Sequence, residues 1–173
     1  MWLFLSSEIV LFGGMIGAFL MMRMSEPGWA ELASHLSVPL GTFNTLILLT
    51  SSFTIVKAFP AIQAGDYRAT SRWLLLTVLM GLAFLLVKGI EWRTELSHGF
   101  VPSGGGFWSF YYIMTGLHAL HVLSGVIFNA ILYFFSQAQK LGGIEQRVEF
   151  AGLYWHFVDV VWIFLFPLLY LSW

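Results

Sequence analysis

Long apolar segments separated by short polar ones dominate this chain. A helix that crosses a bilayer needs about 20 mostly apolar residues. Five segments meet this requirement, and they predict transmembrane helices at about 2–24, 39–60, 72–92, 107–136 and 149–171. The pattern therefore predicts an all-α membrane protein, in which five transmembrane helices form one polytopic domain over residues 1–173.

Composition agrees with this class and excludes several others. The 173 residues are 58% hydrophobic and only 10% charged, whereas an average soluble domain has about 25% charged residues. The net charge of −1 gives no reason to expect a nucleic acid partner. The chain has no cysteine, which excludes a disulfide scaffold, thiolate ligation of zinc or iron–sulfur clusters, and a thiol nucleophile.

Basic residues are divided unevenly between the two sets of loops. The loops after the second and fourth predicted helices, with the adjoining helix ends, contain Lys57, Arg68, Arg72, Lys140 and Arg147. The other loops contain Arg23 and Arg93. Because Lys and Arg favour the cytoplasmic side, we expect a cytoplasmic N-terminus and a periplasmic C-terminus in a bacterial cytoplasmic membrane. Lys57, Arg68 and Arg72 are also candidates for contacts with lipid phosphates or a partner.

Seven of the ionisable side chains within the predicted spans are candidates for a polar contact or a functional role, because a charge there costs at least about 2.5–3.5 kcal/mol. They are Glu8, Lys88, Glu91, His118, His121, His156 and Asp159. Counting along the helices places Glu8, His121 and His156 at a similar depth in the cytoplasmic half. Asp159 and His118 lie one turn further out. We therefore expect a polar seam that joins the first, fourth and fifth predicted helices.

This seam has several interpretations. The simplest is a network of interhelical hydrogen bonds that fixes packing, at about 0.6 kcal/mol per bond. A proton-linked role is the second, because a carboxyl group shielded from water can exchange protons with its neighbours. A metal or haem site is the third, since histidine ligates both, although two histidines three residues apart are a weak signal. Catalysis by this chain alone is the last.

Two further pairs of residues have a spacing that implies contact. Lys88 and Glu91 are three residues apart near the outer end of the third predicted helix. We expect an ion pair that snorkels to the interface, and a contact with a lipid headgroup or a partner subunit is the alternative. Gly13 and Gly17 form a GxxxG pair in the first helix, which predicts close packing against another helix.

Four stretches carry a resemblance to a known family. They are "YWHFVDVVWIFLF" at Tyr154–Phe166, "TGLHALHVLSG" at Thr115–Gly125, "NTLILLTSS" at Asn44–Ser52 and "SSEIVLFGGMIGAF" at Ser6–Phe19. In order and spacing they resemble subunit III of the haem-copper terminal oxidases, the cytochrome c and quinol oxidases. Glu8 and Glu149 also fall where that family has glutamates, and Glu149 is a further candidate for a lipid or partner contact.

The resemblance implies a particular role. The chain would be the five-helix form of subunit III, without the first two helices of longer members. Such a subunit has no catalytic residue and no metal ligand. It packs against catalytic subunit I, together with subunit II, and the haem and copper lie in that partner. The resemblance also implies bound phospholipid, support of proton uptake, and protection of the catalytic subunit during electron transfer to oxygen.

Two alternatives remain open at this point. Accessory proteins of nitric oxide reductase systems share these motifs and this fold. Separately, the oxidase family usually has a Y-G-S-x-F pattern before the fourth helix, and this chain departs from it with the run "SGGGFWSFYY". The second alternative is a stand-alone proton channel or transporter, with a path lined by the acids and histidines of the seam.

Overall fold

The computed structural model describes residues 1–26, 28–140 and 145–171. Its helices are α1 (Trp2–Ser25), α2 (Trp29–Ala33), α3 (Val38–Gln63), α4 (Tyr67–Ser97), α5 (Gly106–Gln137) and α6 (Gln146–Tyr170). No strand occurs within these residues, and the five helices other than α2 are long and apolar enough to cross a membrane. The predicted all-α class with five membrane-spanning helices is confirmed.

The observed helices differ from the predicted segments at their ends. The largest difference is in α4, which begins at Tyr67 and ends at Ser97 instead of covering 72–92. Hydropathy marks the part of a helix that suits lipid, whereas local capping decides where the helix begins. The Asp66 side chain accepts a hydrogen bond from the Ala69 N–H at 2.9 Å, which caps α4 at its true start. The short α2 was not predicted, because five residues are too few to leave a periodic pattern.

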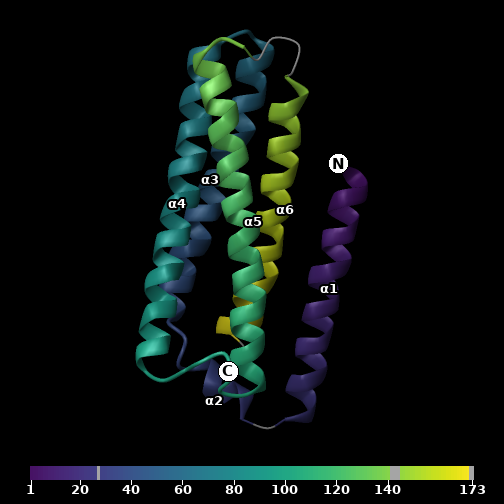
Figure 1. The fold of residues 1–173 in the computed structure, drawn as a ribbon, viewed down its shortest axis with the longest axis vertical. Coiled ribbons are helices and arrows are strands. Elements are labelled where there is room, and N and C mark those ends of the chain that lie inside the picture. The colour runs from purple at the N-terminus through teal and green to yellow at the C-terminus, as the bar shows by residue number, and fades with distance from the viewer. Residues whose placement is uncertain (27, 141–144, 172–173) are drawn as a thin grey trace.

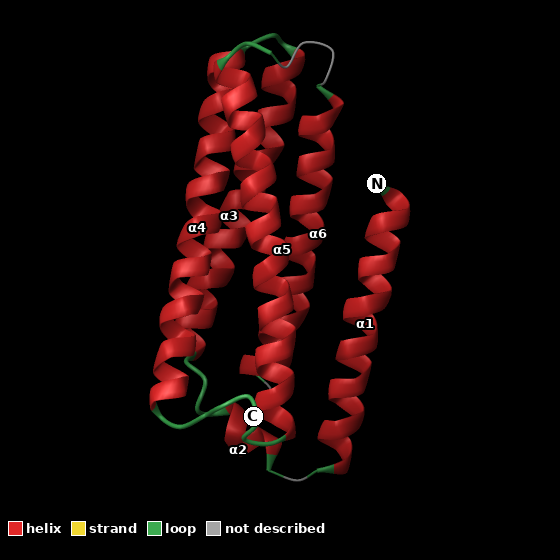
Figure 2. Cartoon of the chain, viewed as in Figure 1, coloured by secondary structure: helices red, strands yellow, loops and turns green. Residues whose placement is uncertain are grey.

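Helices α3, α4, α5 and α6 form a four-helix bundle, and α1 stands beside it next to α5 and α6 (Figure 1). The start of α1 and the end of α6 lie towards opposite ends of the long axis (Figure 2). Phe12 and Phe19 of α1 are buried, while most other residues of this helix are exposed. Phe19 packs edge-on against Trp29 of α2, with ring centroids 5.0 Å apart, so α2 helps to hold the lower end of α1.

Glycines allow close packing inside the bundle but not at α1. A Cβ atom added at Gly125 of α5 would lie 2.7 Å from the Trp155 ring of α6, and one at Gly81 of α4 would meet the same ring at 2.7 Å. By contrast, a Cβ atom at Gly13 or Gly17 would have nothing within 4 Å. No helix of the described chain packs against the GxxxG pair, because that face of α1 points away from the bundle, and close packing of the pair stays a prediction.

Hydroxyl groups of α3 join it to α6. The Trp155 Nε1–H donates to Ser51 Oγ at 2.9 Å, and the Trp162 Nε1–H donates to Thr45 Oγ1 at 3.0 Å. Each tryptophan thus places a large apolar ring in the core and pairs its one polar atom with the neighbouring helix. These bonds fix the register of α6 against α3, and with it the positions of the polar residues on α6.

Candidate functional site

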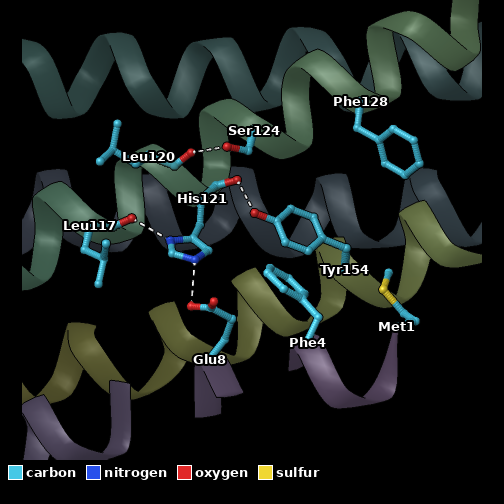
Figure 3. A pocket seen from close by; sticks show the side chains of 9 residues that line it. All are labelled: Met1, Phe4, Glu8, Leu117, Leu120, His121, Ser124, Phe128 and Tyr154. Carbon is cyan, nitrogen blue, oxygen red and sulfur yellow. Dashed lines mark hydrogen bonds and ion pairs between the residues drawn. The ribbon is translucent and has the colours of Figure 1, made fainter. Parts of the chain in front are cut away.

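A hollow of about 520 Å³ lies between α1 and the adjoining parts of α5 and α6. Most of its wall is apolar, from side chains such as Phe4 and Phe128. Glu8 of α1 and His121 of α5 point towards each other across one side of it (Figure 3). Tyr154 of α6 completes the polar part of the wall, and its hydroxyl donates to the His121 carbonyl at 3.1 Å.

The geometry of His121 defines a proton shared with Glu8. The ring Nδ1 lies 2.8 Å from the Leu117 carbonyl oxygen, and Nε2 lies 3.0 Å from Glu8 Oε2. A carbonyl oxygen only accepts hydrogen bonds, so Nδ1 carries a hydrogen. One further proton then lies between Nε2 and the carboxyl group, either on Glu8 or on the ring. In both forms the pair is neutral as a unit.

Packing holds this pair in place. The Glu8 and His121 side chains are only 15% and 14% exposed. The Phe12 ring approaches the His121 ring edge-on, with centroids 5.3 Å apart. The imidazole is therefore fixed by one carbonyl, one carboxyl group and the Phe12 ring, and both the carboxyl group and Phe12 come from α1, beside the four-helix bundle.

His118 lies in a different environment, although it is only one turn from His121. Its ring stacks on Trp162, with centroids 5.1 Å apart at 26°, and meets Phe84 edge-on at 5.6 Å. It is buried, and neither ring nitrogen has a hydrogen-bond partner among the described residues. His118 thus belongs to the aromatic core of the bundle and not to the polar group at α1.

His156 and Asp159 form a third group, on the side of α6 that faces α3. His156 Nδ1 lies 2.7 Å from Ser52 Oγ and 4.0 Å from Asp159 Oδ2. Asp159 is buried, and the Ser52 hydroxyl that contacts His156 also interacts with its carboxyl group. The seam expected from depth alone is therefore divided into three separate places, because residues at one depth point in different directions around their helices.

Lys88 and Glu91 lie in the bundle interior and do not snorkel to the interface. They are 2% and 1% exposed, and the expected interfacial ion pair is wrong in this respect. Lys88 Nζ donates to Glu91 Oε1 and to the Tyr111 hydroxyl, each at 3.2 Å. Tyr111 donates to Glu91 Oε1 at 2.7 Å, and the Tyr170 hydroxyl contacts both charged groups. Sequence reasoning missed the two tyrosines, since each reads as an ordinary aromatic core residue.

The remaining candidates lie near one end of the bundle. Lys57 Nζ lies 5.1 Å from the centroid of the Phe53 ring. Arg68 and Arg72 line a hollow of about 140 Å³ between α4 and α5. Glu149 borders a hollow of about 170 Å³ between α3 and α6, together with His156. Within the described parts of the chain, no cluster of three or more histidine, aspartate or glutamate side chains could hold a metal ion.

Together these features define a polytopic α-helical membrane protein whose polar groups within the spans gather in small clusters between helices. The family model described as "Cytochrome c oxidase subunit III" matches residues 1–173, and the chain belongs to that family. The predicted family resemblance is confirmed.

Curated relatives agree with this assignment. The chain is 36% identical over 171 residues to "Cytochrome c oxidase subunit 3" of Corynebacterium diphtheriae, covering 96% of this chain and 83% of the relative. It is 37% identical over 172 residues to the protein of the same name from Thermostichus vulcanus, covering 97% and 83%. It is also 34% identical over 179 residues to "Heme-copper oxidase subunit I+III" of Aeropyrum pernix, covering 99% of this chain and 22% of that protein.

Proposed function

We propose that this chain is the non-catalytic subunit III of a respiratory haem-copper terminal oxidase in a bacterial cytoplasmic membrane. It packs on catalytic subunit I, beside subunit II, and its residues 1–173 form one polytopic domain with a cytoplasmic N-terminus. Family membership and the names of the curated relatives support this role. The Aeropyrum pernix relative joins subunits I and III in its name, which supports association with subunit I.

The Glu8–His121 pair carries the proposed contribution to proton uptake. Its shared proton lies in the wall of the hollow, between Nε2 of His121 and Oε2 of Glu8, which are 3.0 Å apart. Glu8 lies in the N-terminal half of α1. With a cytoplasmic N-terminus, this is the side from which an oxidase takes up protons. The apolar remainder of the wall suits a phospholipid acyl chain. The hollow would thus hold lipid beside a proton-exchanging group.

The oxidase's haem and copper belong to the catalytic partner in this proposal, and phospholipid is the only ligand of this chain. The contacts of His121 and His118 support that assignment. His121 is bonded to a carbonyl and a carboxyl group, while His118 lies between two aromatic rings. Neither arrangement leaves two imidazoles facing a common centre.

Purification of the intact complex tests the proposal. A tag on this chain should retrieve a haem- and copper-containing catalytic subunit in stoichiometric amount, whereas the isolated polypeptide should show no haem absorption. Glu8→Gln should leave haem content unchanged and slow proton uptake during oxygen reduction. Glu31→Gln, on the exposed side of α2, makes the same chemical change away from the hollow and should leave uptake unchanged.

Other results would contradict this role. Haem bound by the isolated chain would refute a non-catalytic subunit without metal. A purified complex that reduces nitric oxide and not oxygen would favour the nitric oxide reductase alternative. Proton flux through vesicles that contain only this chain, abolished by Glu8→Gln, would favour a stand-alone channel.

A further inference from the structure

Polar groups interrupt the apolar surface of α3 and α6 at mid-membrane depth. His156 lies ten residues after Gln146, where α6 begins, which is about 15 Å along the helix. Ser52 lies fourteen residues after Val38, the first residue of α3, or about 21 Å along it. The His156 side chain is nevertheless 41% exposed. An imidazole at this depth would face hydrocarbon if nothing covered it.

The hydrogen-bonding capacity of the His156 imidazole is not met by the described chain. Ser52 bonds Nδ1 of His156, and among the described residues no side chain or carbonyl bonds Nε2. Whichever tautomer is present, Nε2 retains one donor or acceptor function. The buried carboxyl group of Asp159 lies on the Nδ1 side of the same ring, with its Oδ2 4.0 Å from Nδ1. Lipid tails provide no partner for such groups, so faces that carry them contact protein or water in membrane proteins.

The surface around His156 is shaped to receive a side chain from a neighbour. A hollow of about 170 Å³ runs between α3 and α6, with Ile55, Val56 and Leu153 among its walls. Gly152 keeps it open, since this residue places no side chain there. Glu149 lies at its border and is acidic, which disfavours the phosphate of a lipid headgroup. A large apolar side chain on a packed helix would fill this space as a knob fills a hole.

Other exposed faces of the bundle differ from this one. On the outer side of α4 the exposed large residues include Leu79, Leu82, Leu86 and Ile90. These side chains need no hydrogen-bond partner, and they suit lipid tails. The contrast between an apolar α4 face and a polar, hollowed α3–α6 face points to a protein partner at the second.

We propose that the α3–α6 face around His156 is the docking surface for a transmembrane helix of the catalytic subunit. That helix fills the hollow with an apolar side chain and gives Nε2 of His156 its missing hydrogen bond at mid-membrane. This inference rests on the proposed function, because the partner is the catalytic subunit of the same oxidase.

Site-specific photo-cross-linking in the assembled complex tests the docking surface. A benzophenone amino acid is placed at Val56 of α3, at Val160 of α6, or at Leu86 of α4 as the control. All three side chains are exposed, at 48%, 48% and 68%. Irradiation should attach the catalytic subunit to the chain from Val56 and Val160 but not from Leu86.

Three outcomes would overturn the inference. If the catalytic subunit co-purifies but cross-links only from Leu86, or if Val56 and Val160 give adducts only with lipid or with a second copy of this chain, the docking face is refuted while the proposed function stands. If no catalytic subunit co-purifies, both are refuted.

A pair of substitutions tests the hydrogen bond separately from the packing. His156→Phe keeps a ring of similar size and removes both nitrogens, so the catalytic subunit should be retained about threefold less well in a detergent titration, as expected for one interhelical hydrogen bond. Thr50→Val is the matched control, because Thr50 is exposed on α3 and bonds only its own helix, at the Leu46 carbonyl. Equal retention of both variants would show that no partner bonds His156.

Discussion

At the scale of single residues, the bundle keeps charge in its interior by surrounding it with partners. Lys88 Nζ lies 4.7 Å from the Tyr111 ring centroid, 5.1 Å from that of Tyr170 and 5.4 Å from that of Trp162. It also bonds the Glu91 carboxyl group at 3.2 Å. A buried ion pair contributes little net stability relative to apolar residues, but the loss of one partner leaves the other charge uncompensated.

Removal of the Lys88 charge should therefore be costly. Lys88→Met should lower the free energy of unfolding by about 3–5 kcal/mol, since Glu91 would remain buried without its cation. The double variant Lys88→Met/Glu91→Gln should recover much of this loss. Both values can be measured by denaturant titration of the purified complex, followed by tryptophan fluorescence. Lys57→Met, at an exposed position, serves as the control and should change stability by about 0.5 kcal/mol or less.

His118 should respond in the opposite way. It is buried with both ring nitrogens unpartnered in the described chain, and it stacks on Trp162. His118→Phe keeps the stacking and removes two unsatisfied polar atoms, so the free energy of unfolding should stay the same or rise by about 1 kcal/mol. The haem content of the complex should not change. A variant that loses haem, or unfolds several kcal/mol more easily, would show that the imidazole has a partner.

At the scale of helices, sequence predicts what is local and misses what depends on a neighbour. A run of about 20 apolar residues is a local property, and it identified all five spans. The direction in which a residue points relative to other helices is not local. The GxxxG pair of Gly13 and Gly17 therefore reads as a packing motif, although the helix contacts in the bundle are made at Gly81 and Gly125, which lie in no such motif.

This difference between glycines gives a matched pair of variants. Gly125→Ala would bring a methyl group to 2.7 Å from the Trp155 ring, and the resulting displacement of α5 from α6 should cost about 1–3 kcal/mol. Gly13→Ala adds the same group where nothing lies within 4 Å, and it should leave the unfolding of the isolated chain unchanged or slightly harder. Thermal unfolding of both variants, measured side by side, checks the prediction. Equal effects would mean that α1 packs through its glycines.

At the scale of the whole molecule, sequence also fails to predict the direction in which the side chains of the candidate site point around their helices. The positions of Glu8 and His121 along their helices predicted that they lie at the same depth. The two side chains do meet, because both also point into the gap between α1 and α5. It also placed His156 at that level, but His156 faces α3 and bonds Ser52. Axial position follows from residue number, whereas the angle around each helix becomes known only when the helix neighbours are known. The hydrogen-bond partners of intramembrane residues are therefore the part of the site that sequence could not supply.

The orientation of the molecule in the membrane can be tested directly, since the chain has no native cysteine and single cysteines can be introduced into it. Figure 2 shows the α3–α4 connection at the end of the bundle towards which the N-terminus points, and the α4–α5 connection at the other end. The first connection lies beside Arg68 and Arg72, which favour the cytoplasm. Ala64→Cys should therefore react with a membrane-impermeant maleimide only after the cells are opened.

Ser103→Cys, in the α4–α5 connection, should react in intact spheroplasts. The opposite labelling would place the N-terminal half of α1, with Glu8, towards the side of the membrane where an oxidase releases protons. Because Glu8 lies in the N-terminal half of α1, the proposed part of the pair in proton uptake would then be excluded, while the assignment to the family would be unaffected. Labelling of these two cysteines thus separates the role of the site from the identity of the fold.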